Sequence, residues 1–574
     1  MKREGEAEGG GGGHSWNRLF YGDCLENLEN LELESVDLVY LDPPFKSDQQ
    51  YNMLFGTAEG PDEAQVRAFD DTWYWHSGSS ESYDKLRERG GIQSDTIEAL
   101  RQILGPCGML AYCCFMMERI SAIHRAMKPT ASLYLHCDPT ASHYLKIILD
   151  AVMGSNNFRN EVVWRRATAH SDAKRFGRIS DRLLFYTASD KYCWNADSVR
   201  SPRSAEEMEK AYPLRDDRGQ YRSADLTGPS HGQKQGESVV PWRGYDIRSR
   251  GRVWSAPKTG SYAEWIEKHV IPDYRGIEGV HDRLDALDKA GLITHPEKGF
   301  WPGLKRYAMA DLGVAIQDII YDAVGFTNYS TKGGEYLGYP TQKPLALLER
   351  IIKASSCPGD VVLDPFCGCG TAVDAAQALG RRWIGMDISW LAVDVIRARL
   401  ADVHGPACMK KLEILGVPKD LGAATSLFSR DPLEFERWAV TQVHGKPNDR
   451  QTGDQGVDGI IRFPLDKTSS SRGIVSVKGG RQLGPDFVRD LLGTVHTKQA
   501  ALGLLVTLNS PTRGMTEAAN EAGSWQDPLT GHSFPKIQII TIEDLLKGRK
   551  PKIPTPMNPY AKATHPGTRN ENLL

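Results

Sequence analysis

No stretch of this sequence approaches the roughly 18 uninterrupted apolar residues that a membrane-spanning helix requires. Its first fifteen residues, MKREGEAEGGGGGHS, are a polar glycine tract and lack the apolar centre of a signal peptide. We therefore expect a protein that has no membrane partner and works in the cytoplasm.

Cysteines spaced for a metal site or a disulfide framework are also missing. The ten cysteines are scattered, and their closest groupings are Cys113–Cys114 and Cys367–x–Cys369. A zinc knuckle needs two CxxC pairs, and a disulfide-rich fold needs cysteines at a characteristic series of spacings. The sequence has neither pattern. We expect reduced thiols, most of them buried.

A strong charge of one sign is the third absence, because the formal net charge is −3 over 574 residues. A global sum hides local fields, however. Residues 159–182 contain seven Lys/Arg and three acids. A local basic patch of this kind could bind a polyanion although the net charge of the chain is slightly negative.

Strand patterns that alternate with helix patterns are what the sequence does contain. Residues 36–41, VDLVYL, form a short bounded apolar run of the kind typical of a buried parallel strand. Similar runs recur at 131–138, 182–188, 361–366, 381–388, 473–478 and 502–508. Helical patterns lie between several of them, including residues 140–154 and residues 343–355, the second with a proline in its first turn. This alternation predicts an α/β fold with an open, doubly wound Rossmann-like sheet.

The rhythm breaks at about residue 196, where the chain becomes rich in Arg, Gly, Trp, Tyr and Pro, and a new α/β pattern begins at about residue 429. We interpret the first region as an inserted recognition region and the second as a smaller α/β domain. The predicted organisation is a disordered tail (1–15), a first catalytic half (16–195), the insertion (196–335), a second half (336–405), a linker (406–428), the smaller domain (429–548) and a disordered tail (549–574).

The strand at 36–41 runs directly into an unusual corner, Asp42-Pro43-Pro44-Phe45. The prolines fix φ and donate no hydrogen bond, so this corner holds an acid, a carbonyl and an aromatic ring rigidly at a strand end.

Residues 359–389 form a second informative stretch. One strand ends at Asp364, a turn with Gly368 and Gly370 opens a helix, and a further strand ends at Asp387. This is a nucleoside-binding βαβ pattern, in which the last acid can accept from both ribose hydroxyls. Only Gly-x-Gly is present, whereas a dinucleotide site uses G-x-G-x-x-G to close on a pyrophosphate. S-adenosylmethionine fits this pattern better than NAD.

Together the two stretches resemble the DNA amino-methyltransferases. DPPF is similar to their catalytic (D/N/S)PP(Y/F) tetrapeptide and DPFCGCG to their FxGxG cofactor motif, in the order of the β class. Residues 341–344, TQKP, resemble the family's additional cofactor-side motif, and residues 133–164 resemble a segment of its adenine-specific members. The resemblance implies that the catalytic residues are Asp42, Pro43, Pro44 and Phe45 and that the cofactor-binding residues are Asp364, Phe366, Gly368, Gly370, Asp387, Thr341 and Lys343. Phe45 stands where tyrosine is commoner, which keeps the ring and drops a hydroxyl.

The resemblance predicts a site-specific transfer to the exocyclic amine of a base flipped out of double-stranded DNA. Adenine N6 is favoured because an acid leads the tetrapeptide, and cytosine N4 stays open because the geometry is shared. Methylation at cytosine C5 would need a cysteine nucleophile such as Cys107, and DPPF would then have no explanation. RNA or protein amides would go with an asparagine in place of Asp42.

Residues 433–463 and the following strand at 473–480 resemble a Mrr-like restriction endonuclease domain of the PD-(D/E)xK class. The matching positions are Glu436, Asp458 and Lys478, which implies Mg²⁺ bound at Asp458. Ser476 stands where the family has Glu or Gln, and a hydroxyl is a weaker metal ligand. A degenerate domain and a nuclease therefore both stay open.

The function predicted from the sequence is a methyltransferase in a restriction-modification context. The alternative is a fused nuclease or modification reader in which the C-terminal domain dominates. A second copy of the chain and a restriction subunit are both compatible with this organisation as partners.

Overall fold

The computed structural model divides the chain into two compact units, Met1–Asn195 with Gln317–Leu574, and Ala196–Ile316. It describes residues 17–44, 50–57, 60–70, 73–167, 176–230, 235–295, 302–321, 335, 341–448, 456–464 and 470–556. Phe45 and most of the two predicted tails lie outside the described residues. Residues 549–556 of the second tail are described and contain no helix or strand.

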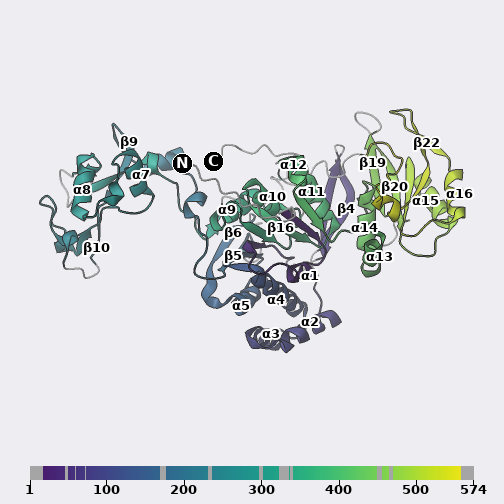
Figure 1. Cartoon of the computed structure of the whole chain (residues 1–574), viewed down its shortest axis with the longest axis horizontal. Helices are drawn as coiled ribbons and strands as arrows, with labels where there is room; N and C mark the ends of the chain where they lie inside the picture. Colours follow the sequence, from purple (N-terminus) through teal and green to yellow (C-terminus); the bar gives the residue numbers. More distant parts are fainter. Residues whose placement is uncertain are drawn as a thin grey trace, which may run out of the picture. The chain divides into compact units, whose positions relative to one another are not determined.

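A mixed sheet of nine described strands forms the centre of the first unit (Figure 1). Every strand is parallel to its neighbours except β7, which is antiparallel to both β5 and β6. The order across the sheet is β14 (Ile319–Ile320), β6 (Phe158–Arg165), β7 (Ser180–Thr187), β5 (Met127–Cys137), β2 (Val36–Leu41), β15 (Val361–Asp364), β16 (Arg382–Asp387), β1 (Asn17–Tyr21) and β17 (Leu412–Leu415).

Helices cover both faces of this sheet, which confirms the doubly wound arrangement (Figure 1). One face carries α1 (Cys24–Glu29), α2 (Ser77–Glu88), α3 (Gly91–Leu104), α4 (Gly108–Ala126) and α5 (Ser142–Met153), and the other carries α9 (Leu345–Ser355), α10 (Thr371–Ala378) and α11 (Trp390–His404). Successive residues of a strand point to opposite faces. Leu38 and Tyr40 of β2 accordingly join the core under α9–α11, whereas Val39 and Leu41 join the core under α1–α5.

The range 406–428, predicted as a linker, is instead structured. It contains α12 (Pro406–Met409), the edge strand β17 and most of α13 (Leu421–Arg430). Strand β17 pairs in parallel with β1 and extends the sheet. All four of its residues are half-buried, and an edge strand of this kind leaves only a short and weak apolar signal in the sequence. The antiparallel hairpin of β3 (Gln50–Thr57) and β4 (Gly60–Asp70) completes this part.

The unit Ala196–Ile316 has a core of its own. Its strands are β8 (Leu214–Asp216), β9 (Gly219–Asp225), β12 (Ile293–Thr294) and β13 (Gly303–Tyr307) in the order β12-β13-β9-β8, and the pair β10 (Thr227–Pro229) with β11 (Arg252–Trp254); its helices are α6 (Ala205–Ala211), α7 (Ser261–His269) and α8 (Val280–Lys289). Trp254 is buried and donates from Nε1 to the Val240 carbonyl, 3.1 Å away. Arg243 forms ion pairs with Asp285 and Asp288. Several aromatic and basic residues of the predicted recognition region therefore build its fold.

The C-terminal domain contains a second, five-stranded sheet. Its order is β18 (Lys446–Pro447), β19 (Gly459–Pro464), β20 (Ser470–Lys478), β21 (Leu502–Thr507) and β24 (Ile537–Thr541), with the hairpin β22 (Ser524–Gln526) and β23 (Ser533–Pro535) and the helices α14 (Pro432–Gln442), α15 (Pro485–Thr497), α16 (Arg513–Glu521) and α17 (Ile542–Leu546). The core under α9–α11 continues into this domain through Leu427, Phe435 and Trp438. The two sheets therefore share one hydrophobic core.

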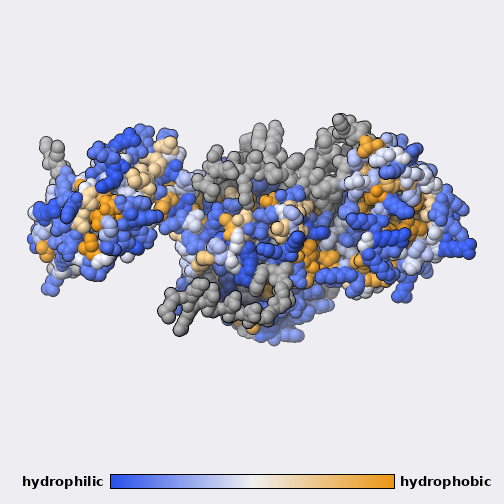
Figure 2. All heavy atoms as spheres, turned by 45° about the horizontal axis from the view of Figure 1, so that its top comes forward, coloured by the Kyte–Doolittle hydropathy of each residue, from blue (hydrophilic) through white to orange (hydrophobic). Residues whose placement is uncertain are grey.

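Most of the cysteine thiols are buried. All ten cysteines are free, and seven of them are buried, as predicted. Hydrophilic residues predominate on the face drawn in Figure 2, where hydrophobic residues form small separate patches. Of the helices that the structure describes, none combines the length and the apolar character needed to cross a membrane.

Candidate active site

Three acids follow or end adjacent parallel strands of the large sheet. Asp42 follows β2, Asp364 ends β15 and Asp387 ends β16. Strands β2 and β15 pair through Val362 opposite Leu38, so two segments far apart in sequence become neighbours. The carboxyl ends of adjacent parallel strands are where open α/β sheets bind ligands.

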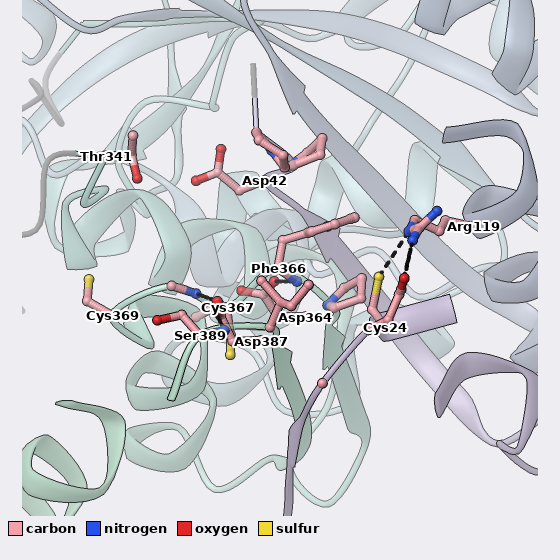
Figure 3. Close-up of a pocket in the computed structure, with 18 of the residues that line it drawn as sticks. Cys24, Asp42, Arg119, Thr341, Asp364, Phe366, Cys367, Cys369, Asp387 and Ser389 are labelled. Atoms are coloured by element: carbon pink, nitrogen blue, oxygen red, sulfur yellow. Dashed lines mark hydrogen bonds and ion pairs between the residues drawn. The ribbon is translucent and has the colours of Figure 1, made fainter. Parts of the chain in front are cut away.

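These ends line one cavity of about 470 Å³. In the view of Figure 3, Asp42 approaches the cavity from one side, and Asp364, Asp387 and Ser389 approach it from the other. Of the predicted site residues, the cavity brings together Asp42, Pro43, Pro44, Thr341, Lys343, Asp364, Phe366, Gly368 and Asp387. Among the described residues that line the cavity, Cys107, the cysteine considered for a C5 mechanism, is absent.

Lys343 contacts the catalytic corner directly. Its Nζ lies 2.5 Å from Asp42 Oδ2 and also donates to the Thr341 carbonyl at 3.2 Å. The two charged side chains are only 7 % and 16 % exposed, and a buried charge of this kind is tolerated only with a partner. The structure thus gives Lys343, predicted on the cofactor side alone, a position that fixes Asp42.

The turn after β15 has the backbone that only glycine adopts readily. Gly368 and Gly370 have φ values of 50° and 77°. A Cβ on Gly370 would lie 2.6 Å from Ile396 Cγ1, so α11 also requires glycine there. Gly370 is the N-cap of α10 and sets the direction in which that helix leaves the site.

Asp387 is held by two backbone amides. Gly368 N donates to its Oδ2 at 2.8 Å, and Ser389 N donates to its Oδ1 at 2.9 Å. A carboxylate offers about four lone-pair positions, so two stay open for hydroxyl donors of a ligand. Burial raises the pKa of Asp387 to about 7, in spite of these two hydrogen bonds.

The cavity as a whole is acidic. Its acids are Asp23, Asp42, Asp364, Asp387, Asp431 and Glu434, and its bases are Arg119, Lys343 and Arg437, which leaves a formal excess of 6 − 3 = 3 negative charges. Burial raises the pKa of Asp364 well above its ordinary range, and the nearby Asp42 and Asp387 raise it further. A ligand with positive charge relieves this repulsion.

Sequence reasoning missed an arginine at the cavity. Arg119 Nη2 donates to both oxygens of Asp23 at 2.7 and 2.9 Å, and its Nε donates to Cys24 Sγ at 3.3 Å (Figure 3). The guanidinium also lies over the Phe115 ring, 3.4 Å from the centroid. One signal was available, because Arg119 and Glu118 end the apolar run of residues 109–117 within helix α4.

Two of the three predicted nuclease residues, Asp458 and Lys478, lie close together. Asp458 Oδ2 accepts from Val477 N at 2.6 Å and from Ser476 Oγ at 3.2 Å, and Lys478 Nζ lies 3.7 Å from it. Glu436 lies on α14. Among the residues that the structure describes, no group of three or more His, Cys, Asp or Glu is placed to hold a metal ion.

Two family models match the chain. Residues 36–398 match the N6/N4 methyltransferase family, described as DNA methylase. Residues 433–547 match a family described as NACHT-associated inactive restriction endonuclease.

Individual relatives cover parts of the chain. The Type II methyltransferase M.EcaI of Enterobacter cloacae is 29 % identical over 297 residues, 52 % of this chain and 59 % of the relative. The Mod subunit of the Type III restriction-modification enzyme StyLTI of Salmonella typhimurium is 23 % identical over 366 residues, 62 % of this chain and 48 % of the relative. The chain thus spans about half the length of these relatives. A solved structure of a Thermus thermophilus protein assigned as a DNA modification methylase, complexed with S-adenosyl-L-methionine, is 15 % identical, with a TM-score of 0.30, covering 70 % of this chain and 98 % of the other.

The glycine turn yields a stability prediction. We expect Gly370→Ala to lower the free energy of unfolding by about 2–5 kcal/mol, from about 1–2 kcal/mol of left-handed strain and about 1–3 kcal/mol of overpacking against Ile396. Gly380→Ala is the matched control, because Gly380 has a similar φ of 70° and open space around its Cβ position. Gly380→Ala should lower the free energy of unfolding by the strain contribution alone, about 1–2 kcal/mol. Calorimetric unfolding of both variants measures this, and equal losses would contradict the packing argument.

Proposed function

Because the chain belongs to the DNA methylase family of N6/N4 amino-methyltransferases, we propose that it methylates the exocyclic amine of a base flipped out of double-stranded DNA, with adenine N6 as the target. The observation that carries this proposal is the single cavity shared by the Asp42-Pro43-Pro44 corner, the glycine turn and Asp387. S-adenosylmethionine supplies the methyl group from its sulfonium centre. The proposed partners are double-stranded DNA and, since one relative is named as a Mod subunit, a restriction subunit.

The cofactor is suited to the residues that line the cavity. The open lone pairs of Asp387 can accept from the two ribose hydroxyls. Asp364, 4 % exposed, can pair with the ammonium group of the methionine part. The sulfonium and ammonium charges together oppose the acidic excess of the cavity.

The catalytic corner acts on the amine. The Asp42 carboxylate and the Pro43 carbonyl are two acceptors for its hydrogens, which turns the nitrogen lone pair toward the methyl donor. Lys343 holds one Asp42 oxygen in place, 2.5 Å away, so the acceptor does not have to reorganise during the transfer. Adenine is preferred to cytosine because an acid leads the tetrapeptide, and cytosine N4 is the alternative target.

We propose that the C-terminal domain does not cut DNA. One of the two Asp458 carboxylate oxygens, Oδ2, already accepts from Val477 N and Ser476 Oγ, which leaves fewer positions for Mg²⁺. The matching family is named as inactive, and Ser476 replaces the acid or amide of active members. The domain is proposed instead to support the methyltransferase.

Substitution of Asp42 tests the transfer. With S-adenosylmethionine and genomic DNA, the wild type is expected to place N6-methyladenine at one recurring site, mapped by modified-base sequencing. Asp42→Ala should lower the rate by about 10²-fold to 10³-fold, because one positioned acceptor is lost. Calorimetric titration should find cofactor affinity little changed. Loss of cofactor binding instead would contradict the catalytic role, and N4-methylcytosine would correct the target base.

The raised pKa of Asp387 predicts a pH dependence of cofactor affinity. A carboxyl group with a pKa of about 7 is ionised above that pH, where it can accept from the ribose, and neutral below it. We expect the affinity for S-adenosylmethionine to fall as the pH drops from about 8 to 6, approaching tenfold per pH unit. Asp387→Asn should bind weakly throughout and lose this dependence, and the difference between the two proteins cancels titration of the ligand itself.

The same shift predicts the opposite trend for folding of the free protein. A folded pKa above the unfolded value gives stability that is present at low pH and lost as the pH rises through about 7. A pH series of melting temperatures without cofactor measures this. Identical series for wild type and Asp387→Asn would contradict the assignment of the shift to Asp387.

The nuclease question has a direct assay. Wild type and Lys478→Ala are incubated with Mg²⁺ and methylated or unmethylated plasmid, and we expect neither protein to nick or cut the DNA. Cutting by the wild type that requires Mg²⁺ and disappears in Lys478→Ala would overturn the proposal.

A further inference from the structure

Helix α14, the first helix of the restriction-endonuclease-like domain, lines the cofactor cavity. Asp431, Leu433, Glu434 and Arg437 all belong to the cavity wall. Residues 433, 434 and 437 lie on one side of the helix, because positions three and four apart are neighbours on its surface. The DNA methylase family model matches residues 36–398, so this contribution comes from outside the methyltransferase region.

We infer that α14 closes the cavity against the adenosine part of the cofactor and that the Glu434 carboxylate accepts a hydrogen bond from the nucleoside. The inference rests on the proposed use of S-adenosylmethionine. It makes the C-terminal domain a part of the methyltransferase site.

Position along the sheet decides which part of the cofactor meets α14. Tyr21, the last residue of β1, lies opposite Asp387 in the parallel pairing of β1 with β16. The Tyr21 hydroxyl donates to Glu434 Oε2 at 3.2 Å. Glu434 therefore lies on the β1 side of Asp387, away from Asp42 on β2. The nucleoside end occupies this side if Asp387 holds the ribose.

The lining on this side is suited to a nucleoside. Ile388 follows Asp387, is 61 % exposed and faces the cavity, where it offers an apolar surface to a base. The negative charge of Glu434 contributes to the raised pKa of Asp387, which is a further sign that the two carboxyl groups are close. The Asp387 and Glu434 carboxylates can both accept hydrogen bonds from an adenine amine or from a ribose hydroxyl.

Arg437 positions Glu434. Its Nη1 donates to Glu434 Oε1 at 2.5 Å, and the two side chains are only 14 % and 13 % exposed. Within the described residues, Arg437 Nε is buried without a hydrogen-bond partner, so a donor stays available beside the cavity. A charged hydrogen bond in such a shielded place is stronger than one in water.

The helix is held firmly in place. Phe435 and Trp438 point into the hydrophobic core that α14 shares with α11, and both are fully buried. Trp390, the first residue of α11, packs edge-on against the Tyr21 ring, 5.5 Å between centroids. Contacts of this kind fix the wall of the cavity before any ligand arrives.

Titration of the full-length protein with two ligands tests the inference. S-adenosylmethionine and S-adenosylhomocysteine share the adenosine, and only the first carries the sulfonium charge. Glu434→Gln keeps the shape and removes the charge of the acceptor, so we expect both ligands to bind about fivefold to tenfold more weakly, the difference between a charged and a neutral hydrogen bond. A loss confined to S-adenosylmethionine would assign Glu434 a charge effect on the sulfonium and overturn the adenosine contact.

Two further variants complete the test. Glu349→Gln is the matched control, because Glu349 pairs with Lys353 on α9 in the same manner and does not line the cavity among the described residues; its affinity should equal that of the wild type. Tyr21→Phe removes the hydroxyl that orients Glu434 and keeps the ring, so it should give a smaller loss, and it serves if Glu434→Gln folds poorly. Unchanged affinity in both Glu434→Gln and Tyr21→Phe would refute the inference while leaving the proposed function intact. A wild type that binds neither ligand would refute the proposed function itself.

Discussion

The pairing of β2 with β15 is the constraint on which the whole site depends. Leu38 lies opposite Val362, and Val39 lies opposite Leu363, although more than 300 residues separate them in the chain. Both strands are buried on both faces, so their register is fixed by two hydrophobic cores at once. A slip of one residue would exchange the faces of every side chain and would move Asp42 away from Asp364.

Charge is the second organising feature of the site. Six acids and three bases line one cavity, and each base contacts an acid: Lys343 contacts Asp42, Arg119 contacts Asp23 and Arg437 contacts Glu434. The unpaired excess lies with Asp364, Asp387 and Asp431, and burial raises the pKa values of the first two. A ligand with positive charge is favoured there, because it stabilises the ionised forms of Asp364 and Asp387.

Local chemistry explains which parts of the site the sequence could predict. A short apolar run precedes each of the three acids Asp42, Asp364 and Asp387. The two prolines and the glycine turn lie beside them in sequence, so each part of the site can be predicted from its local sequence alone. The doubly wound fold follows from the same runs. Arg119 left a weaker signal, as a charge at the end of the apolar run of residues 109–117.

Contacts across the chain explain what the sequence could not predict. The Lys343–Asp42 pair joins positions 301 residues apart, and the Tyr21–Glu434 bond joins positions 413 apart. No local pattern encodes such a partner. The burial of aromatic residues such as Trp254 could not be predicted for a similar reason. The sequence does not distinguish a ring that packs in a core from a ring that stacks on a base. The edge strand β17 has half-buried residues only, and so its apolar signal was too short to separate it from a linker.

The route of the chain around the unit Ala196–Ile316 has an evolutionary consequence. The chain leaves the sheet from β7 and returns on β14, which is separated from β7 only by β6. Because β7 is antiparallel to β6 while β14 is parallel to it, departure and return take place at the same end of the sheet. The unit has its own core, so another folded module with similarly placed ends could replace it without repacking the sheet. Selection could therefore exchange this unit while the sheet and the cavity at its strand ends are inherited unchanged.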